Sequence, residues 1–305
     1  MGPTVCNEQN ARLIMNAEPF VDAIPAIRLL TRCPVLIERD GTLVTITGYD
    51  LDSAILADDW KVPTVALEDA VKLLNEALDD FSFATPHDRS RALASIITPA
   101  LIHGDLLGGR APVDLGEADA SQTGKGYRNK LTAAIYGERV ATVTQRRGGV
   151  GSLEESFDSV LIRGDSFIAL DNMRGTIDSP KLESFMTEDR YQARIPYSRA
   201  IEIDPSRITI MMTSNRAELT KDWANRTICV EILKQSDDYV FGNFPEGDLL
   251  DHVRANKERY LGAVFAVIKH GSLRGSRNPT NAVMIFDAGQ KFWTGSSRTS
   301  WKRLR

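Results

Sequence analysis

Three polar residues stand at the ends of segments that could place them around a phosphate group. Lys125 lies at the start of a predicted helix, where a lysine can reach the outer phosphates of a nucleotide. Asp171 follows four apolar residues, and a carboxylate at the carboxyl end of a buried strand can hold Mg²⁺ directly or through water. Asn215 ends a second, largely apolar run, and its amide can orient an attacking water. Phosphoryl transfer is the chemistry that such a set would serve.

The segment 118–126 is a candidate phosphate-binding loop, because a Gly-Lys pair stands at the mouth of a helix. A Gly-Lys pair alone is a weak signal, and this loop is degenerate. Asp119 takes the place of the first glycine, and Gly126 takes the place of the Ser or Thr that binds magnesium. Asp114 and Glu117 in the preceding strand fit a buried strand poorly. The candidate nucleotide-binding residues are Thr123, Gly124, Lys125 and Gly126.

Arg226 precedes a further predicted strand. An arginine there is well placed to reach the γ-phosphate in a neighbouring subunit, where it would stabilise transition-state charge. The alternative is a surface arginine in an ordinary ion pair. Asp171 and Asn215 have comparable alternatives, since many strands end in an Asp or Asn turn.

Strands and helices alternate from about residue 112 to residue 233. This alternation predicts an α/β fold in which helices cover a parallel sheet. The helix at 152–163 is expected to begin with a capping box of Ser152 and Glu155. The expected helices are 125–136, 152–163 and one starting at Ser179-Pro180; the expected strands are 139–144, 166–171, 207–213 and 227–232.

The flanking regions predict a division into three parts. Residues 1–65 form a small N-terminal module with a hairpin turning at Asp40-Gly41, followed by a polar connection from Thr47. An ATPase-type core is expected over 66–235, beginning with amphipathic helices at 66–83 and 88–101. The remaining residues, 236–305, are predicted to contain one long helix over 249–270, ended by Gly271, and a basic tail.

Composition is that of an ordinary soluble globular protein, with 42 % hydrophobic and 26 % charged residues. No apolar run reaches the roughly 20 residues that span a bilayer. The first residues lack an export leader, and the three cysteines form no disulfide or zinc pattern. We therefore expect a cytoplasmic protein without a membrane partner or structural metal. The net charge of −4 argues against general nucleic-acid coating, although the basic stretch after residue 268 is either an electrostatic handle or a solvated end.

The order and spacing of these motifs resemble those of AAA+ and superfamily-three helicase ATPases. More specifically, they are similar to the ATPase part of phage and plasmid primase–helicase proteins, over roughly residues 88–233. The segments that carry the resemblance are Thr123-Gly-Lys-Gly, 144–157, Leu170-Asp-Asn-Met-Arg-Gly, 182–189 and Met212-Thr-Ser-Asn. The Thr47-Gly-Tyr-Asp segment also resembles the connector that precedes such cores.

The resemblance implies a P-loop fold of AAA+ type, with ATP and Mg²⁺ as cofactors and a homo-oligomeric ring as the active form. Lys125 would neutralise phosphates, Asp171 would hold the metal, and Arg226 would complete the neighbour's site. Asn215, and with it Asn172, would position water. Most AAA+ proteins have a catalytic glutamate where Asn172 stands, and an asparagine cannot take a proton.

The resemblance also implies a partner: DNA, most simply single-stranded, gripped by a hairpin between the Asp171 and Asn215 strands. Arg194 and Arg199 would meet phosphates and Tyr197 would stack on a base; an ordinary exposed hairpin is the alternative. A primase would be a separate protein. The resulting expectation is an ATP-dependent DNA helicase or replication ATPase of a phage, plasmid or integrated element. The rival is a replication scaffold that binds nucleotide and DNA without hydrolysis.

Overall fold

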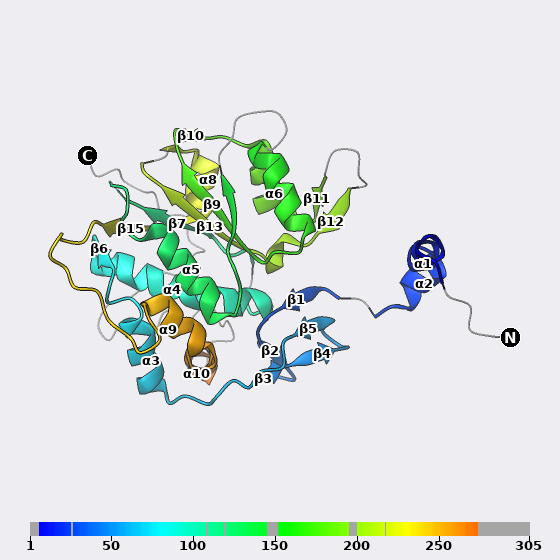
Figure 1. Cartoon of the computed structure of the whole chain (residues 1–305), viewed down its shortest axis with the longest axis horizontal. Helices are drawn as coiled ribbons and strands as arrows, with labels where there is room; N and C mark the ends of the chain where they lie inside the picture. Colours follow the sequence, from blue (N-terminus) through cyan, green and yellow to red (C-terminus); the bar gives the residue numbers. More distant parts are fainter. Residues whose placement is uncertain are drawn as a thin grey trace.

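A six-stranded sheet forms the centre of the protein in the computed structural model, which describes residues 6–25, 27–107, 109–118, 120–144, 152–194, 200–216 and 218–273. The strand order is β6-β15-β7-β13-β9-β8 (Figure 1). Five strands are parallel, and only the edge strand β6 is antiparallel among these six. The strands are β6 (Ser82–Phe83), β7 (Val113–Glu117), β8 (Ala141–Thr144), β9 (Phe167–Met173), β13 (Thr209–Ser214) and β15 (Thr227–Leu233).

Helices cover both faces of this sheet, so the predicted α/β fold is confirmed. One face packs against α3, α4, α5, α9 and α10, and the other against α6, α7 and α8. Successive strand residues alternate between the two faces: Phe167 belongs to the first cluster and Ile168 to the second. The helices are α3 (Leu67–Glu76), α4 (Pro86–His103), α5 (Lys125–Ile135), α6 (Leu153–Ile162), α7 (Pro180–Thr187), α8 (Lys221–Asn225), α9 (Leu249–Ala255) and α10 (Lys257–Leu273).

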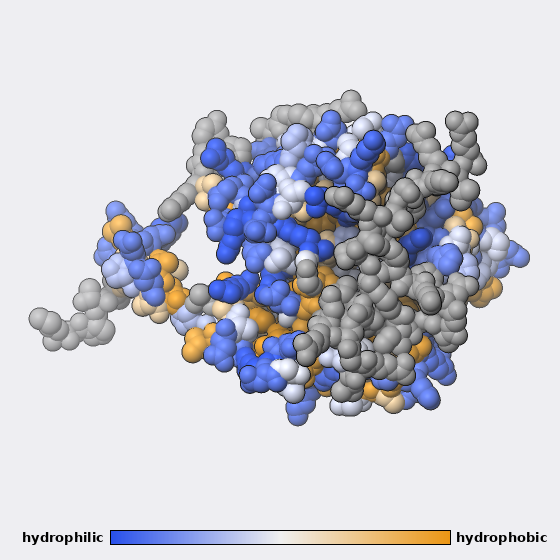
Figure 2. All heavy atoms as spheres, turned by 180° about the vertical axis from the view of Figure 1, so that it is seen from behind, coloured by the Kyte–Doolittle hydropathy of each residue, from blue (hydrophilic) through white to orange (hydrophobic). Residues whose placement is uncertain are grey.

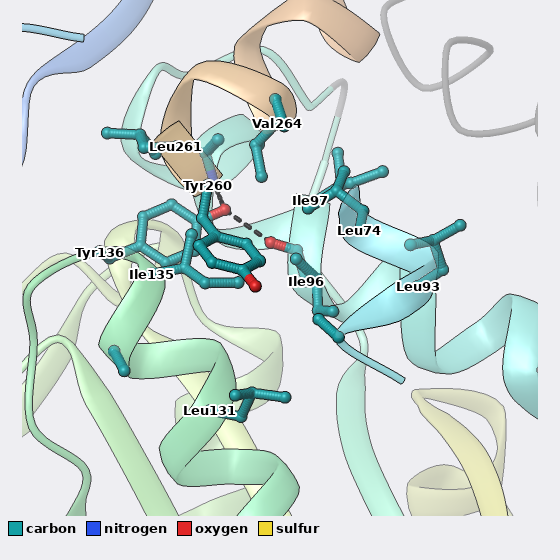
Figure 3. Packing of buried hydrophobic residues seen from close by; sticks show 14 of the residues in the cluster. Leu74, Leu93, Ile96, Ile97, Leu131, Ile135, Tyr136, Tyr260, Leu261 and Val264 are labelled. Atoms are coloured by element: carbon teal, nitrogen blue, oxygen red, sulfur yellow. Dashed lines mark hydrogen bonds between the residues drawn. The ribbon is translucent and has the colours of Figure 1, made fainter. Parts of the chain in front are cut away.

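Tyr136, the residue that follows α5, connects this helix to α4 (Figure 3). Its hydroxyl donates to the carbonyl of Ile96 at 2.6 Å and accepts from the amide of Ala100 at 3.2 Å, both on α4. Burial raises the pKa of Tyr136 well above its ordinary value. Tyr260 and Leu261 bring α10 into the same cluster, so the helix that follows the sheet is part of the main core.

The C-terminal helical region differs from the expectation of one helix ended by Gly271. It consists of two helices, α9 and α10, separated at Asn256, and α10 continues past Gly271 to Leu273. The side-chain amide of Asn256 donates to the carbonyl of His252 at 2.9 Å and to Glu246 at 3.0 Å. A side chain that competes for a helical carbonyl in this way favours a break in the helix.

The N-terminal module contains the predicted hairpin, with left-handed φ angles of 52° at Asp40 and 75° at Gly41. The expected polar connection from Thr47 is wrong in part, because Gly48–Asp50 forms strand β4. Arg39 holds Asp50 there through bonds of 2.8 and 2.9 Å. The other elements are α1 (Glu8–Met15), α2 (Glu18–Ala23), β1 (Leu29–Thr31), β2 (Val35–Arg39), β3 (Thr42–Ile46) and β5 (Ile55–Ala57).

On the face shown in Figure 2, the coloured residues are largely hydrophilic with several apolar groups between them. The two N-terminal helices expose apolar side chains, among them Leu13, Ile14 and Phe20. Leu36 of β2, in contrast, is fully buried in the main cluster with α4. The three-part division at residues 65 and 235 therefore remains a prediction, with contacts crossing both boundaries. Within the described residues, no helix is both long enough and apolar enough to cross a membrane.

His103 makes the stability of the fold depend on pH. The side chain is 1 % exposed at the end of α4, and neither ring nitrogen has a hydrogen-bond partner among the described residues. Burial, and secondarily the Arg207 cation, lower the pKa of His103 to about 4. The unfolded chain therefore binds the proton more readily, so stability is complete above about pH 6.5 and falls as the pH drops toward 4.

Acidification should lower the free energy of unfolding of the wild-type protein by about 3 kcal/mol through His103, and we expect His103→Leu to remove this loss. Urea unfolding of wild-type and variant proteins at pH 7.5, 6 and 4.5 measures the difference directly. Leucine fills a similar volume beside Tyr136 and Phe167, whose rings flank the imidazole. Parallel stability curves for the two proteins would contradict the expectation.

Candidate functional site

A cleft of about 450 Å³ lies at the carboxyl ends of β7, β9 and β13. Parallel strands end at the same edge of a sheet, and ligands of open α/β sheets bind there. The cleft collects residues from three distant parts of the sequence. Its lining consists of Ser121, Gln122, Thr123, Gly124, Lys125, Gly126, Tyr127, Asp171, Asn172, Arg174, Thr213 and Asn215.

The loop before α5 brings a helix N-terminus to this cleft. Gly124 precedes the helix with a left-handed φ of 89°, and Gln122 has a φ of 62°. A Cβ atom on Gly124 would lie 3.3 Å from the Phe81 ring, so both conformation and space favour glycine. In the described structure no side chain caps the first turn, and open amide groups at a helix N-terminus attract anions.

The ammonium group of Lys125 points to oxygen atoms at the cleft. Its Nζ atom donates to Asn215 Oδ1 at 2.7 Å, to the Ala120 carbonyl at 3.2 Å and to Thr123 Oγ1 at 3.3 Å. The sequence alone did not predict that Asn215 contacts Lys125 directly.

Thr213 connects Asp171 to the neighbouring strand. Its hydroxyl donates to Asp171 Oδ1 at 2.5 Å and accepts from the Asn172 amide at 2.8 Å. Asn172 has a left-handed φ of 54°, and the β9–β13 register shifts beside it. The described residues contain no group of three His, Cys, Asp or Glu side chains able to hold a metal. Mg²⁺ at Asp171 would thus take its remaining ligands from water and phosphate, as this ion prefers.

Gly126 leaves open space at the position of the missing Ser or Thr, since a Cβ atom there would meet nothing within 4 Å. Thr213 is the hydroxyl that the structure supplies near Asp171 instead. The residues present therefore fit a magnesium ion held by one carboxylate and water.

Arg174 and Tyr127 are among the lining residues that the sequence analysis did not assign to the site. Arg174 donates from Nε to Asn172 Oδ1 at 3.3 Å, and it lies inside the motif 170–175 that carries the family resemblance. Tyr127 follows Gly126 directly, and its hydroxyl accepts from the Leu250 amide at 2.8 Å. Burial is the main cause that raises the pKa of Tyr127 to about 12, so it stays protonated at neutral pH.

The acidic residues of β7 fit the strand because each has a specific partner. Asp114 accepts from Arg128 Nη2 at 2.8 Å, and the arginine side chain is 1 % exposed. This pair connects β7 to α5, on either side of the loop that leads into α5. Glu117 accepts from the Arg216 amide, and burial raises its pKa. The judgement that both acids suit a buried strand poorly missed partners that are distant in sequence.

Arg226 lies apart from the cleft of its own chain. It precedes β15, whose first residue Thr227 pairs with Val113 at the start of β7. The cleft is at the other end of these strands, about 13 Å away, because the five residues of β7 span four steps of about 3.3 Å. The Arg226 side chain is exposed and does not line the cleft.

An antiparallel pair of strands follows α7, in the place predicted for the hairpin. Tyr191–Ala193 forms β11 and Ile201–Ile203 forms β12. Arg194 comes directly after β11, whereas Tyr197 and Arg199 lie outside the described residues. The remaining short elements of this region are β10 (Thr176–Ile177), β14 (Glu218–Leu219) and the 3₁₀ turn η1 (Pro205–Arg207).

No protein-family model matches the chain, and no curated protein matches it. Two A-form apo structures of the NrS-1 C-terminal region are similar to it. One is 15 % identical over 84 % of this chain and 58 % of that chain, with a TM-score of 0.44. The other is 13 % identical over 75 % and 63 %, with a TM-score of 0.43.

A structure of JCV helicase with a small molecule bound is 8 % identical over 67 % of this chain and 55 % of that chain, with a TM-score of 0.36. The chain thus spans 55 to 63 % of the length of these three structures.

Proposed function

We propose that this chain is the ATPase core of a DNA helicase or replication ATPase of a phage, plasmid or integrated element. The observation that carries the proposal is the meeting of Lys125, Asp171 and Asn215 in one cleft beside the N-terminus of α5. A cation, a carboxylate and an amide, converging at the carboxyl edge of a parallel sheet, suit a nucleotide triphosphate with its metal. ATP and Mg²⁺ are the proposed cofactors.

Each residue has a role in this proposal. Lys125 and the amide groups of the first turn of α5 bind the outer phosphates, with Thr123, Gly124 and Gly126 shaping the loop. Magnesium, held by Asp171, would supply positive charge that offsets charge developing on the transferred phosphate. The Asn215 amide orients the attacking water. Asn172 lines the same cleft and assists, although an amide accepts no proton.

The proposed active form is a homo-oligomeric ring on single-stranded DNA, with a primase as a separate protein. Two features support assembly and DNA binding. Arg226 is exposed at the edge away from its own cleft, where it can serve a neighbour. The β11–β12 pair stands outside the six-stranded sheet, and the exposed Arg194 directly after β11 can meet a DNA phosphate.

A second function, a nucleotide-binding replication scaffold without hydrolysis, is favoured by one specific observation. Asn172 stands next to the proposed metal ligand in a left-handed conformation, where a carboxylate would otherwise serve as general base. A measurement of ATP hydrolysis distinguishes the two functions.

We expect the purified protein to hydrolyse ATP only with Mg²⁺, and faster with single-stranded DNA. Asp171→Asn should lower turnover by about 100-fold or more, because an amide is a poor magnesium ligand. A fluorescent nucleotide should still bind without magnesium. Asp178→Asn, an exposed carboxylate outside the cleft, is the matched control. Nucleotide binding without turnover in the wild-type protein would support the scaffold instead.

A further inference from the structure

Asp158 is a completely buried carboxylate on α6, with 0 % of its surface exposed. Its Oδ1 atom accepts from the Tyr191 hydroxyl at 2.7 Å, and its Oδ2 atom accepts from the Arg194 amide at 2.8 Å. The ammonium of Lys181 also binds Oδ2. One side chain therefore gathers donors from β11, from the residue after β11, and from α7.

This polar cluster lies within an aromatic environment. Phe157, Phe185 and Tyr191 pack edge to face, with ring centroids 4.9 to 6.3 Å apart. Apolar side chains would fill such a place at least as favourably, since burying a charge removes it from water. Hydrogen bonds to a buried carboxylate, however, fix the direction of their donors. The cluster is therefore better explained by the orientation that it gives to its donors than by a contribution to the free energy of unfolding.

The element whose direction it fixes is the β11–β12 hairpin. Each strand has three residues, and neither strand pairs with the six-stranded sheet (Figure 1). Two-stranded ribbons of this length are marginal by themselves, so packing and anchoring must set their orientation. The Arg194 amide bond to Asp158 fixes the chain at the point where it leaves β11 toward the loop.

The same carboxylate connects the hairpin to α7 through Lys181. Lys181 is on α7, the helix that follows β9 and Asp171 along the chain. The capping hydroxyl of α7, Ser179 Oγ, donates to Glu154 on α6 at 3.0 Å. The root of the hairpin, here Tyr191 to Arg194, is thereby held together with α6 and α7 as one unit.

We propose that Asp158 is a positioning residue that holds the root of the β11–β12 hairpin on α6 and α7, and thereby couples single-stranded nucleic acid at the hairpin to the nucleotide cleft. This inference rests on the proposed function, because it takes the hairpin as the nucleic-acid contact. Asp158 touches neither nucleotide nor nucleic acid. It acts through the direction that it imposes on the chain at Arg194.

Asp158→Asn tests the proposal in the full chain. Asparagine has nearly the same shape as aspartate, but its NH₂ group cannot accept a hydrogen bond. The donors at one of the two Asp158 oxygen positions therefore lose their acceptor. We expect faster hydrogen exchange in peptides covering 190–204 and unchanged exchange in β9. Affinity for a fluorescent oligothymidylate should fall about 10-fold, with loss of DNA-stimulated turnover, while turnover without DNA stays within about twofold. Asp165→Asn, in a more exposed ion pair just beyond α6, should change none of these.

A second variant guards against simple misfolding. The triple change Asp158→Leu, Lys181→Met and Tyr191→Phe removes the charged pair and the hydroxyl together, so the core stays apolar. We expect wild-type thermal stability but the same loss of DNA affinity and the same faster hairpin exchange, because Arg194 has lost its acceptor.

Unchanged hairpin exchange, or wild-type DNA affinity and stimulation in either folded variant, would overturn the positioning role. A wild-type protein that binds no DNA, yet shows the exchange change in Asp158→Asn, would overturn the coupling through the proposed function instead. The exchange and DNA measurements therefore separate the two failures.

Discussion

Replacing Lys125 by alanine should reduce ATP turnover by about 100-fold or more, comparable to the loss of one positioned donor in an electrostatic site. The reason is that its ammonium group lines the cleft at the N-terminus of α5, where it donates to Asn215 Oδ1 at 2.7 Å. A lysine in this place can neutralise the charge of a bound phosphate. Steady-state hydrolysis at saturating ATP and Mg²⁺ measures the loss.

Folding should survive this change. Lys125 is half-buried at the open cleft, and water can replace its hydrogen bonds to Asn215 and Thr123. The thermal midpoint should therefore shift little. Lys130→Ala is a matched control, because Lys130 lies on the same helix but is exposed and outside the cleft. Turnover by Lys125→Ala at the wild-type rate would remove the proposed phosphate role.

The assembly of the cleft was predictable from sequence because it depends on a regular feature. Asp171 and Asn215 end two parallel strands, whose carboxyl ends share an edge, and Lys125 opens the helix at that edge. The structure places all three in one cleft. Their chemical roles remain predictions, since geometry gives position and not turnover.

Other features depend on contacts that no local pattern contains. Asp114 fits its strand only because Arg128 on the following helix reaches back to it. The break at Asn256 arises from side-chain hydrogen bonds inside an otherwise helical pattern. The bonds of Thr213 to Asp171 and Asn172 depend on which strands are neighbours in the sheet. Strand order is a tertiary property, so the periodicity of a single segment cannot supply it.

Arg226→Ala should lower the rate of ATP turnover by a factor on the order of 10³–10⁵ and leave the affinity for nucleotide unchanged. This is the expected result for an arginine that acts on a phosphate bound by the neighbouring subunit. Action on a neighbouring subunit is consistent with the position of Arg226, which precedes β15 at the end of the strands that lies away from its own cleft. Lys221→Ala, an exposed charge on the adjacent α8, should retain activity.

Mixing Arg226→Ala with Lys125→Ala protein should restore part of the activity. In mixed rings, a subunit with an intact Lys125 can face a neighbour with an intact Arg226, which gives some complete sites. The specific activity of the wild-type protein should also rise with concentration, because assembly creates the sites. Turnover that is independent of concentration, or a lack of complementation in mixtures shown to co-assemble, would make Arg226 an ordinary surface arginine and would refute the ring.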